Sequence, residues 1–282
     1  MASRIPPLLD TYLHLPPETS LVLLSGVLGS TTNWLVLRYI YSLLSTPSVP
    51  LPREDGLDLP RNDGASVILI SFLRDYTFWK DGAGKLGVDL DVLTKKGNFI
   101  FVDGLTGLFH ASHSYAPEKL LGRKVLSAPT LQHFCKQVED AITQVQHSAP
   151  DQKIVLIADQ LDLLLAASGD GISSQALRCT LLDIREKVHS SIITIFADEP
   201  LISSQTTPLE KDHAAFAVSL AHDAHLMVSS RMLDTGTARD VSGVLRVTPG
   251  GGNHDTDCMV EERELLYFVA GDGGVRVFER GQ

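Results

Sequence analysis

Residues 26–33 (Gly-Val-Leu-Gly-Ser-Thr-Thr-Asn) stand where an α/β nucleotide-binding protein holds phosphate, between a strand-like apolar run and a helix-like run. A working phosphate loop reads G-x-x-x-x-G-K-[ST]: backbone N–H groups cradle phosphate, the lysine reaches the β- and γ-phosphates, and the hydroxyl binds Mg²⁺. Counted from Gly26, Thr31 replaces the second glycine, Thr32 the lysine and Asn33 the serine or threonine. The segment keeps the layout of a phosphate loop and lacks the side chains that bind nucleotide.

This loop has two interpretations. One is a non-standard nucleotide site, in which Ser30, Thr31 and backbone amides hold phosphate; the other is an ordinary turn between a strand and a helix. Without the lysine, the β- and γ-phosphates lose their main side-chain counter-charge. We therefore predict that no nucleotide or other cofactor binds this degenerate loop, which comprises Gly26, Gly29, Ser30, Thr31 and Thr32.

Two further segments resemble parts of an ATPase site. Asp159 ends an apolar run in the manner of a Walker B strand, whose aspartate holds Mg²⁺ through water, but it is equally suited to capping a turn or the next helix. Residues 99–105 resemble the strand after which RecA-like ATPases place the glutamate that polarises water. Leu105 takes that place here, and the next glutamate is Glu118. We predict no catalytic residue.

Other reactive residue types form no recognisable centre in the sequence. Histidines and acids gather as His110 with His113, as His222 with His225, and as His254 with Asp255, Asp257 and Cys258. None has the C-x-x-C or H-E-x-x-H context of a zinc site, so we predict no metal. A nucleophile elbow, G-x-S-x-G, does not occur. Basic residues gather weakly at 95–96, at 119–124, and at Arg231, Arg239 and Arg246, without interleaved aromatic residues for stacking on bases.

The elements that must position these residues alternate between apolar runs and amphipathic helices, which is typical of βαβ units and a mostly parallel sheet. Strands are predicted at 20–25, 66–71, 98–103, 153–159, 190–197 and 225–230, and helices at 130–147, 174–189 and 208–221. Short strands follow at 244–248, 265–269 and 275–278 without intervening helices, which predicts an antiparallel extension at the C-terminal end. Residues 45–66 are rich in Pro, Asp and Gly and are predicted to be a loop insertion.

Composition narrows the class of protein. The chain has 282 residues, a formal charge of −10 and three widely spaced cysteines. An acidic chain does not attract nucleic acid globally, so an RNA contact needs a local basic patch. The cysteine pattern favours a reducing compartment, and we find neither a signal peptide nor an apolar run of membrane-spanning length. We expect a protein of the cytoplasm, and of the nucleus as well.

Four sequence blocks carry a family resemblance. They are residues 85–90 (KLGVDL), 96–105 (KGNFIFVDGL), 155–165 (VLIADQLDLLL) and 232–246 (MLDTGTARDVSGVLR). On these blocks the chain resembles the family of subunit six of the Elongator complex, in a fungal form, over nearly its whole length apart from 45–66. The resemblance implies a single RecA-like domain over residues 1–282 without a functional phosphate loop.

The resemblance also implies a function. Subunits four, five and six of that complex form a hetero-hexameric ring with two copies of each, which binds tRNA and docks on the catalytic subunits one, two and three. The whole complex modifies the wobble uridine of certain tRNAs, and the ring has been associated with ATP hydrolysis that promotes tRNA release. The resemblance thus predicts a non-catalytic scaffold subunit. An active ATPase with an unconventional phosphate loop and a DNA recombination factor with the same fold remain as alternatives.

Candidate RNA contacts follow by analogy with RecA-like rings, in which the loops after the fourth and fifth strands face the pore. These would be residues 166–172 and 198–208 here. The candidate contact residues are Ser168, Ser203, Ser204 and Gln205 from these loops, and Arg231 and Arg239 from the basic cluster.

Overall fold

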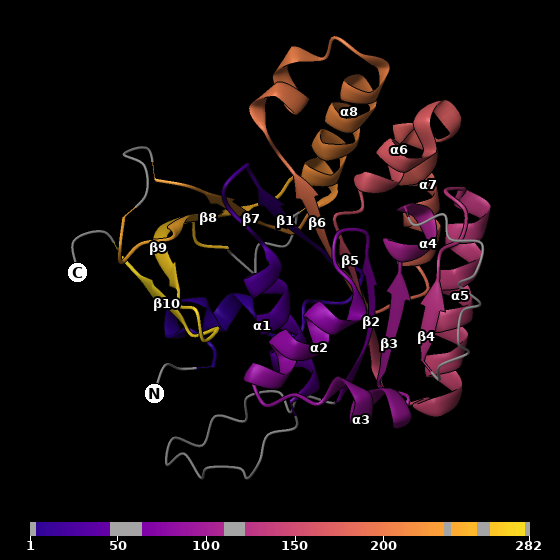
Figure 1. The fold of residues 1–282 in the computed structure, drawn as a ribbon, viewed down its shortest axis with the longest axis horizontal. Helices are drawn as coiled ribbons and strands as arrows, with labels where there is room; N and C mark the ends of the chain where they lie inside the picture. Colours follow the sequence, from indigo (N-terminus) through magenta and orange to yellow (C-terminus); the bar gives the residue numbers. More distant parts are fainter. Residues whose placement is uncertain (1–3, 46–63, 110–121, 234–237, 253–259, 280–282) are drawn as a thin grey trace.

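A computed structural model describes residues 4–45, 64–109, 122–233, 238–252 and 260–279. Among these residues, ten strands form one sheet in the order β10-β9-β8-β7-β1-β6-β5-β2-β3-β4. The sheet runs through the whole molecule, with helices on both faces (Figure 1). The α/β fold with a mostly parallel sheet, predicted from the alternating pattern, is confirmed.

Seven neighbouring strands are parallel. They are β7 (Leu226–Arg231), β1 (Leu21–Gly26), β6 (Ser190–Phe196), β5 (Lys153–Asp159), β2 (Ala65–Ser71), β3 (Phe99–Asp103) and β4 (Arg123–Val125). Strand β2 is buried at every position, and β1 is buried at all but one, because helices cover both faces of this part of the sheet. The carboxyl ends of these strands meet at one edge of the sheet, where the phosphate loop lies.

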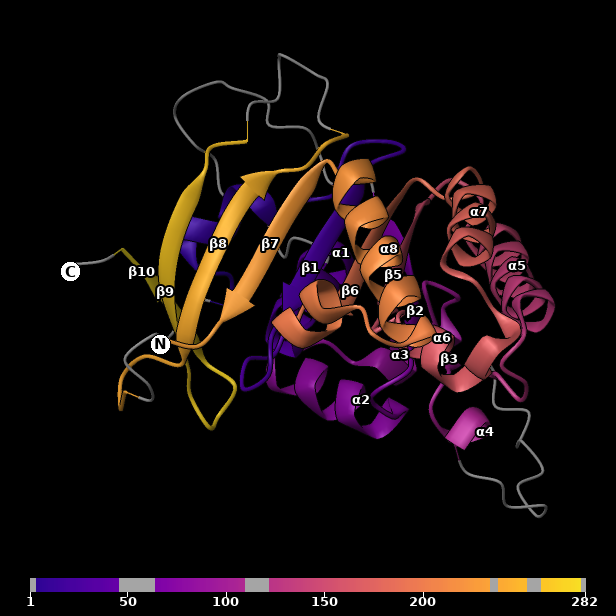
Figure 2. The same cartoon turned by 90° about the horizontal axis from the view of Figure 1, so that it is seen from above.

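Three more strands form the antiparallel extension. β8 (Gly243–Pro249) pairs with β7, β9 (Arg263–Val269) pairs with β8, and β10 (Val275–Phe278) forms the outer edge. Figure 2 shows these strands reaching beyond the helical layers. The predicted C-terminal extension is therefore confirmed.

One face of the sheet is covered by helices from the first half of the chain. They are η1 (Pro7–Tyr12), α1 (Asn33–Leu44), α2 (Tyr76–Lys85) and α3 (Leu90–Lys95). Their apolar side chains, including the fully buried Trp79 and Tyr39, pack on alternate residues of the strands, such as Val67 and Leu69 of β2.

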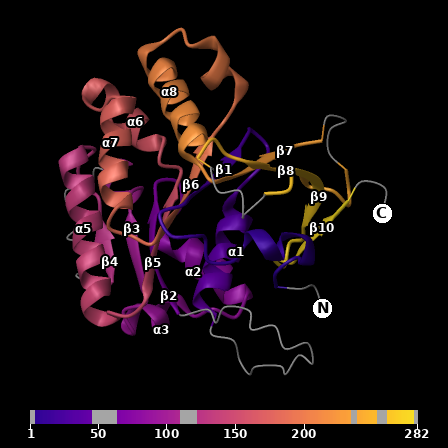
Figure 3. The ribbon, with the colours of Figure 1, turned by 180° about the vertical axis from the view of Figure 1, so that it is seen from behind.

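The opposite face is covered by α5 (Leu131–Ser148), α7 (Ser174–Arg185) and α8 (Pro208–Asp223), as seen from behind in Figure 3. Apolar residues recur in α5 at helical spacing, and Phe134, Val138, Ile142 and Val145 are all buried. Short helical segments, α4 (Thr106–Phe109), α6 (Leu163–Ser168), η2 (Gly169–Gly171) and the π-helical turn η3 (Pro200–Ser204), follow strands β3, β5 and β6. None of the described helices is both long and apolar enough to cross a membrane.

Several sequence boundaries need correction. The predicted helix at 174–189 ends at Arg185, and strand β4 was not predicted, because its three residues carry no period. The predicted insertion at 45–66 falls almost entirely outside the described residues. Its last two residues, Ala65 and Ser66, belong to β2 instead.

Candidate functional site: a phosphate loop closed by the protein itself

The degenerate phosphate loop connects β1 to α1 and is held by its own chain. The N–H of Ser30 donates to the carbonyl of Val27 at 2.9 Å, and the N–H of Val27 donates to the carbonyl of Ser230 on neighbouring β7 at 3.3 Å. The Ser30 hydroxyl accepts from Val27 N–H and lies 2.8 Å from the carbonyls of Val27 and Ser230. Ser30 thus closes the turn rather than pointing to a ligand.

The residues in the lysine and magnesium positions are inside the protein. Thr32 is 1% exposed and Asn33 is 7% exposed, so neither side chain reaches a ligand outside the loop. Thr31 is exposed, but its hydroxyl accepts from the N–H of Asn33 at 3.2 Å. Gly29 has a φ of +88°, and a Cβ there would lie 2.2 Å from Met232 Sδ. This glycine is therefore required by the backbone and by packing against Met232, independently of any phosphate.

An acidic side chain takes the place of the phosphate. The N–H of Leu28, at the exposed tip of the loop, donates to Asp198 Oδ1 at 2.6 Å. Asp198 follows the end of β6, and Ala197 N–H donates to Gly26 O at 2.8 Å, which fixes the two segments together. An anion bound by this N–H would have to displace a carboxylate of the same charge. The loop therefore lacks the lysine, and the Leu28 amide at its tip is already bonded to a carboxylate.

Asp159, in the Walker B position, is completely buried at the end of β5. Its carboxylate accepts from the hydroxyls of Ser71 at 2.8 Å and Thr194 at 3.1 Å, on the two flanking strands. Burial raises the pKa of Asp159 to about 6, although both hydroxyl bonds lower it. Asp159 therefore ties three strands together; it neither caps the next helix nor faces solvent.

A second buried carboxylate, Asp162, lies one turn further along the chain. Its Oδ2 accepts from the N–H of Phe196 at 3.3 Å and is 3.7 Å from Nδ1 of His213, a residue of α8. His213 Nε2 in turn bonds the carbonyl of Phe196 at 3.0 Å. Burial raises the pKa of Asp162 to about 7 and lowers the pKa of His213. These two side chains clamp the last residue of β6, two residues before Asp198.

After β3, the position of the catalytic glutamate is held by Leu105, as the sequence indicates. Asp103 Oδ1 accepts from the N–H groups of Leu105 at 2.9 Å and Thr106 at 2.7 Å, so this carboxylate holds the first turn of α4. The side chains of Ser71, Asp103 and Asp159 at the carboxyl ends of β2, β3 and β5 thus all form internal bonds. No group of three or more metal-ligating side chains is found in the described part of the chain.

The structure places four of the six candidate RNA contacts in two segments that flank α8, and the other two on different elements. Ser168 ends α6, Ser203 and Ser204 belong to η3, and Gln205 follows η3; both segments pack against α8 at the carboxyl edge of the sheet. The Ser168 hydroxyl donates to Leu165 O at 2.9 Å, whereas Ser203 and Gln205 are exposed. Gln205 is left-handed, with a φ of 43°, and its side-chain amide donates to Ile202 O.

The two arginines lie elsewhere. Arg231 ends β7, beside the phosphate loop, and its guanidinium is 3.6 Å from the Glu264 carboxylate. Arg239 is exposed in the segment before β8. In the basic cluster at 119–124, residues 119–121 lie outside the described residues. Arg123 belongs to β4, its guanidinium stacks 3.6 Å from the centre of the Tyr76 ring, and it faces Asp91 at 3.5 Å. His110, His113 and the group at 254–258 lie outside the described residues.

Comparison with known proteins decides the family. The model of the family described as Elongation complex protein 6 matches residues 61–269. The chain belongs to this family. Its relatives include the Elongator complex protein 6 homolog of Schizosaccharomyces pombe, 26% identical over 95% of this chain and 94% of that protein. Elongator complex protein 6 of Danio rerio is 25% identical over 77% of this chain and 81% of its own length.

A solved structure supports the fold. A KaiC-like protein from the hyperthermophilic archaeon Pyrococcus horikoshii superposes with a TM-score of 0.57 at 14% identity, covering 99% of this chain and 98% of that one. The likeness concerns architecture only at this identity. A RecA-type fold is therefore shown.

The blocks that carry the family resemblance have structural roles in the protein. Gly87 adopts a φ of +85° between α2 and α3, Val88 and Leu90 are buried beside it, and Asp89 caps α3 by accepting from Val92 N–H at 3.0 Å. Gly97 adopts a φ of +80°, where a Cβ would lie 2.2 Å from Ser148 Cβ. These residues specify a turn and a close approach of the chain, and none of them lines the phosphate loop.

Sequence reasoning missed Asp198, Asp162 and His213. An acid directly after an apolar strand was the available signal for Asp198, but the partner Leu28 is 170 positions away. Only the strand order, with β6 beside β1, places that acid at the phosphate loop.

Proposed function

We propose that this chain is a non-catalytic scaffold subunit of the Elongator complex, which joins subunits four and five in a hetero-hexameric ring. The observation that carries the proposal is the closed phosphate loop in a member of the Elongation complex protein 6 family. Buried Thr32 stands in the lysine position, and the carboxylate of Asp198 accepts from the Leu28 N–H at the tip of the loop. A fold with ATPase architecture that has lost its ligand site retains rigid faces for neighbouring subunits.

The proposed role of the ring is to bind tRNA for wobble-uridine modification by the catalytic subunits one, two and three, in the cytoplasm and the nucleus. Support comes from the exposed segment around Ser203 and Gln205 at the carboxyl edge of the sheet, which the clamp on Phe196 anchors. Hydroxyl and amide groups of this kind donate to phosphate oxygens without reading sequence. The alternative of an active ATPase has no support from the geometry of Thr32, Asn33 or Asp159.

Assembly is tested by co-expressing the chain with subunits four and five and weighing the product by native mass spectrometry. The proposal predicts a hexamer with two copies of each subunit, and a chain that is poorly soluble without them. Interfaces of this kind bury more than about 1,000 Å² in total. A well-behaved monomer that does not join the other two subunits would contradict it.

The RNA contact is tested on the assembled ring. Replacing Ser203 and Gln205 by Ala should weaken tRNA binding several-fold, measured by fluorescence anisotropy at fixed salt. Replacing Ser219 by Ala is a matched control, because its hydroxyl bonds Ala215 within α8 at 2.7 Å. If tRNA affinity is the same in all three proteins, the loop is not the contact.

A further inference from the structure

The outer strand of the antiparallel extension, β10, has one side that is already paired and one that is not. Its residues face β9 in the register Val275–Val269, Arg276–Phe268 and Val277–Tyr267. In an antiparallel pair, alternate residues direct their N–H and C=O groups toward the partner or away from it. Which residues of β10 point outward therefore follows from how β9 bonds to its other neighbour.

Two bonds settle the alternation. Val269 N–H donates to Ser242 Oγ at 3.0 Å, and Tyr267 O accepts from Ser242 N–H at 2.7 Å. Ser242 precedes β8, so the main-chain groups of Val269 and Tyr267 point away from β10. Their partners Val275 and Val277 are then the non-bonded pairs of the ladder, and their N–H and C=O groups point to the free edge.

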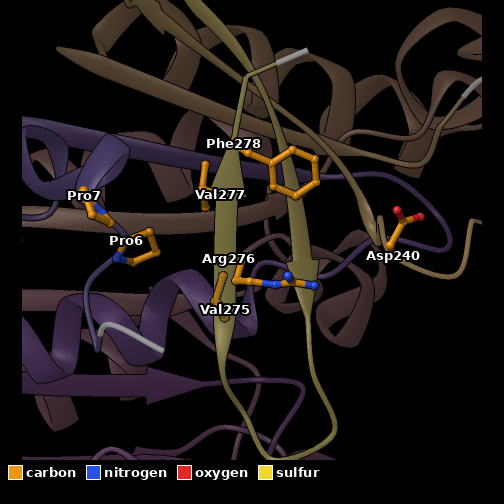
Figure 4. A pocket seen from close by; sticks show the side chains of 7 residues that line it. All are labelled: Pro6, Pro7, Asp240, Val275, Arg276, Val277 and Phe278. Atoms are coloured by element: carbon orange, nitrogen blue, oxygen red, sulfur yellow. The ribbon is translucent and has the colours of Figure 1, made fainter. Parts of the chain in front are cut away.

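This edge borders a groove. A cavity of about 440 Å³ is lined by Pro6, Pro7, Asp240 and residues 275–278. Figure 4 shows Pro6 and Pro7 on one side of β10, with the side chains of Arg276 and Phe278 extending to the other. Proline has no N–H to donate, so Pro6 and Pro7 cannot supply amide donors to the edge carbonyls. The outward groups of Val275 and Val277 have no partner in the described part of the chain.

The side chains indicate what kind of strand fits. Val275 and Val277 pack with the apolar core, and Arg276 is exposed on the opposite face of the strand. The Arg276 guanidinium stacks 5.1 Å from the centre of the Phe268 ring and has no ion-pair partner in the segments that the structure describes. A second copy paired about Arg276 would set two arginines directly opposite each other, which is unfavourable. The guanidinium leans toward β9, so it leaves the Phe268 ring when it meets an acidic residue on a strand added at the free edge. A different chain with an acidic residue opposite Arg276 matches the charge.

We propose that β10 is an attachment strand for another subunit of the complex, whose extended segment adds to the free edge with β-branched residues beside Pro6 and Pro7 and an acidic residue facing Arg276. The inference rests on the proposed function, since it takes the partner from the assembly. Strand addition of this kind draws affinity from main-chain bonds and specificity from alternate side chains.

The test is residue-level hydrogen exchange on the wild-type chain in its co-expressed assembly with subunits four and five, compared with the chain alone at the low concentrations at which it stays in solution. The amides of Val275 and Val277 should slow by at least about tenfold in the assembly. The amide of Arg276, which already bonds β9, should change much less. Equal protection of all three amides, or of none, would overturn the proposal while leaving the assembly itself established.

Two matched variants extend the test. Val277→Pro removes one outward N–H without removing a bond to β9, and prolines are tolerated on edge strands in this orientation. Val277→Ala shortens the same side chain and keeps the N–H. The proposal predicts that co-purification with the other subunits is lost or reduced about tenfold for V277P and retained for V277A, and that Arg276→Glu weakens it more than Arg276→Lys.

The remaining outcomes are also decisive. If V277P and V277A co-purify equally with the other subunits, β10 is not an attachment strand, and the proposed function is unaffected. If the amides of Val275 and Val277 are protected from exchange in the isolated chain, and more so at higher concentration, the edge pairs with a second copy of this chain. That result would contradict the proposed acidic strand from another subunit. Failure of the wild-type chain to join subunits four and five removes both the proposed function and this inference.

Discussion

The clamp at the end of β6 predicts an unusual dependence of stability on pH. Asp162 is 4% exposed, its Oδ1 has no hydrogen-bond partner among the described residues, and burial raises its pKa to about 7. Replacing Asp162 by Asn keeps an oxygen for the Phe196 N–H and removes the ionisable group. The variant should therefore be more stable than the wild type wherever the wild-type carboxyl is ionised.

The size of the effect follows from the two pKa values. The pKa of this carboxyl is about 7 in the folded chain and has its ordinary value of 3.8 in the unfolded chain. Between these pH values the folded state binds more protons, so the free energy of unfolding falls as pH rises. A difference of one pKa unit corresponds to about 1.4 kcal/mol, so the full effect is on the order of 4 kcal/mol by pH 8.

His213 is expected to change the free energy of unfolding with pH in the opposite direction to Asp162. Burial lowers its pKa from 6.5, so its contribution to stability grows as pH rises toward that value. This term, and that of Asp159, are present in both proteins. Asp162 lies 3.7 Å from His213 and its pKa is raised further by Asp159, so the difference between D162N and the wild type reports Asp162 together with its coupling to these two groups.

Pulse proteolysis in urea at pH 5 and pH 8 measures this difference at low protein concentration. We expect the advantage of D162N over the wild type to grow by about 3 kcal/mol between the two pH values, since part of the effect is already present at pH 5. Asp140, an exposed acid of α5 outside the clamp, provides a control as D140N, which removes a carboxyl group without touching the clamp. A constant or shrinking advantage of D162N would refute the view that Asp162 is a buried structural acid.

Three further changes test the phosphate loop and its surroundings. Gly29→Ala should cost about 1–3 kcal/mol of stability because Gly29 has a positive φ and the new Cβ overlaps with Met232. Adding Met232→Ala to the same chain should recover part of this loss in denaturant titrations. No recovery would exclude the overlap as the cause. Asp198→Ala should speed exchange of the Leu28 amide without creating ATP affinity, because the lysine is still missing; unchanged exchange would count against the Asp198 bond. Thr207→Ala removes the capping box of α8 and should cost about 1 kcal/mol in thermal unfolding, and an unchanged melting temperature would contradict the cap.

Local patterns predicted much of the fold. The strand, glycine loop and helix predicted within residues 21–40 appear there, although the helix continues to Leu44. The helical period of α5 and the proline at the start of α8 identify those helices. The antiparallel extension was predicted because no helix-length segment separates its strands. These features depend on neighbours in sequence.

The features that were missed depend on distant neighbours. Helix α2 contains Gly82 and Gly84, which weaken any helix signal, but a Cβ at Gly82 would lie 2.7 Å from Leu37 Cδ1 of α1. The glycine thus serves the packing of two helices, which a sequence pattern does not reveal. Asp198 and the Asp162–His213 pair likewise acquire their meaning only when β5, β6 and α8 are assembled.

We propose that this chain has exchanged nucleotide binding for a structural role, and calorimetric titration with Mg²⁺ and ATP tests the loss of nucleotide binding most directly. We expect no saturable binding of ATP to the purified chain at ATP concentrations up to about 1 mM, where a dissociation constant corresponds to a binding free energy of about −4 kcal/mol. Micromolar binding that disappears when Ser30 and Thr31 are both changed to Ala would contradict it, and would make the loop a working site of unconventional form.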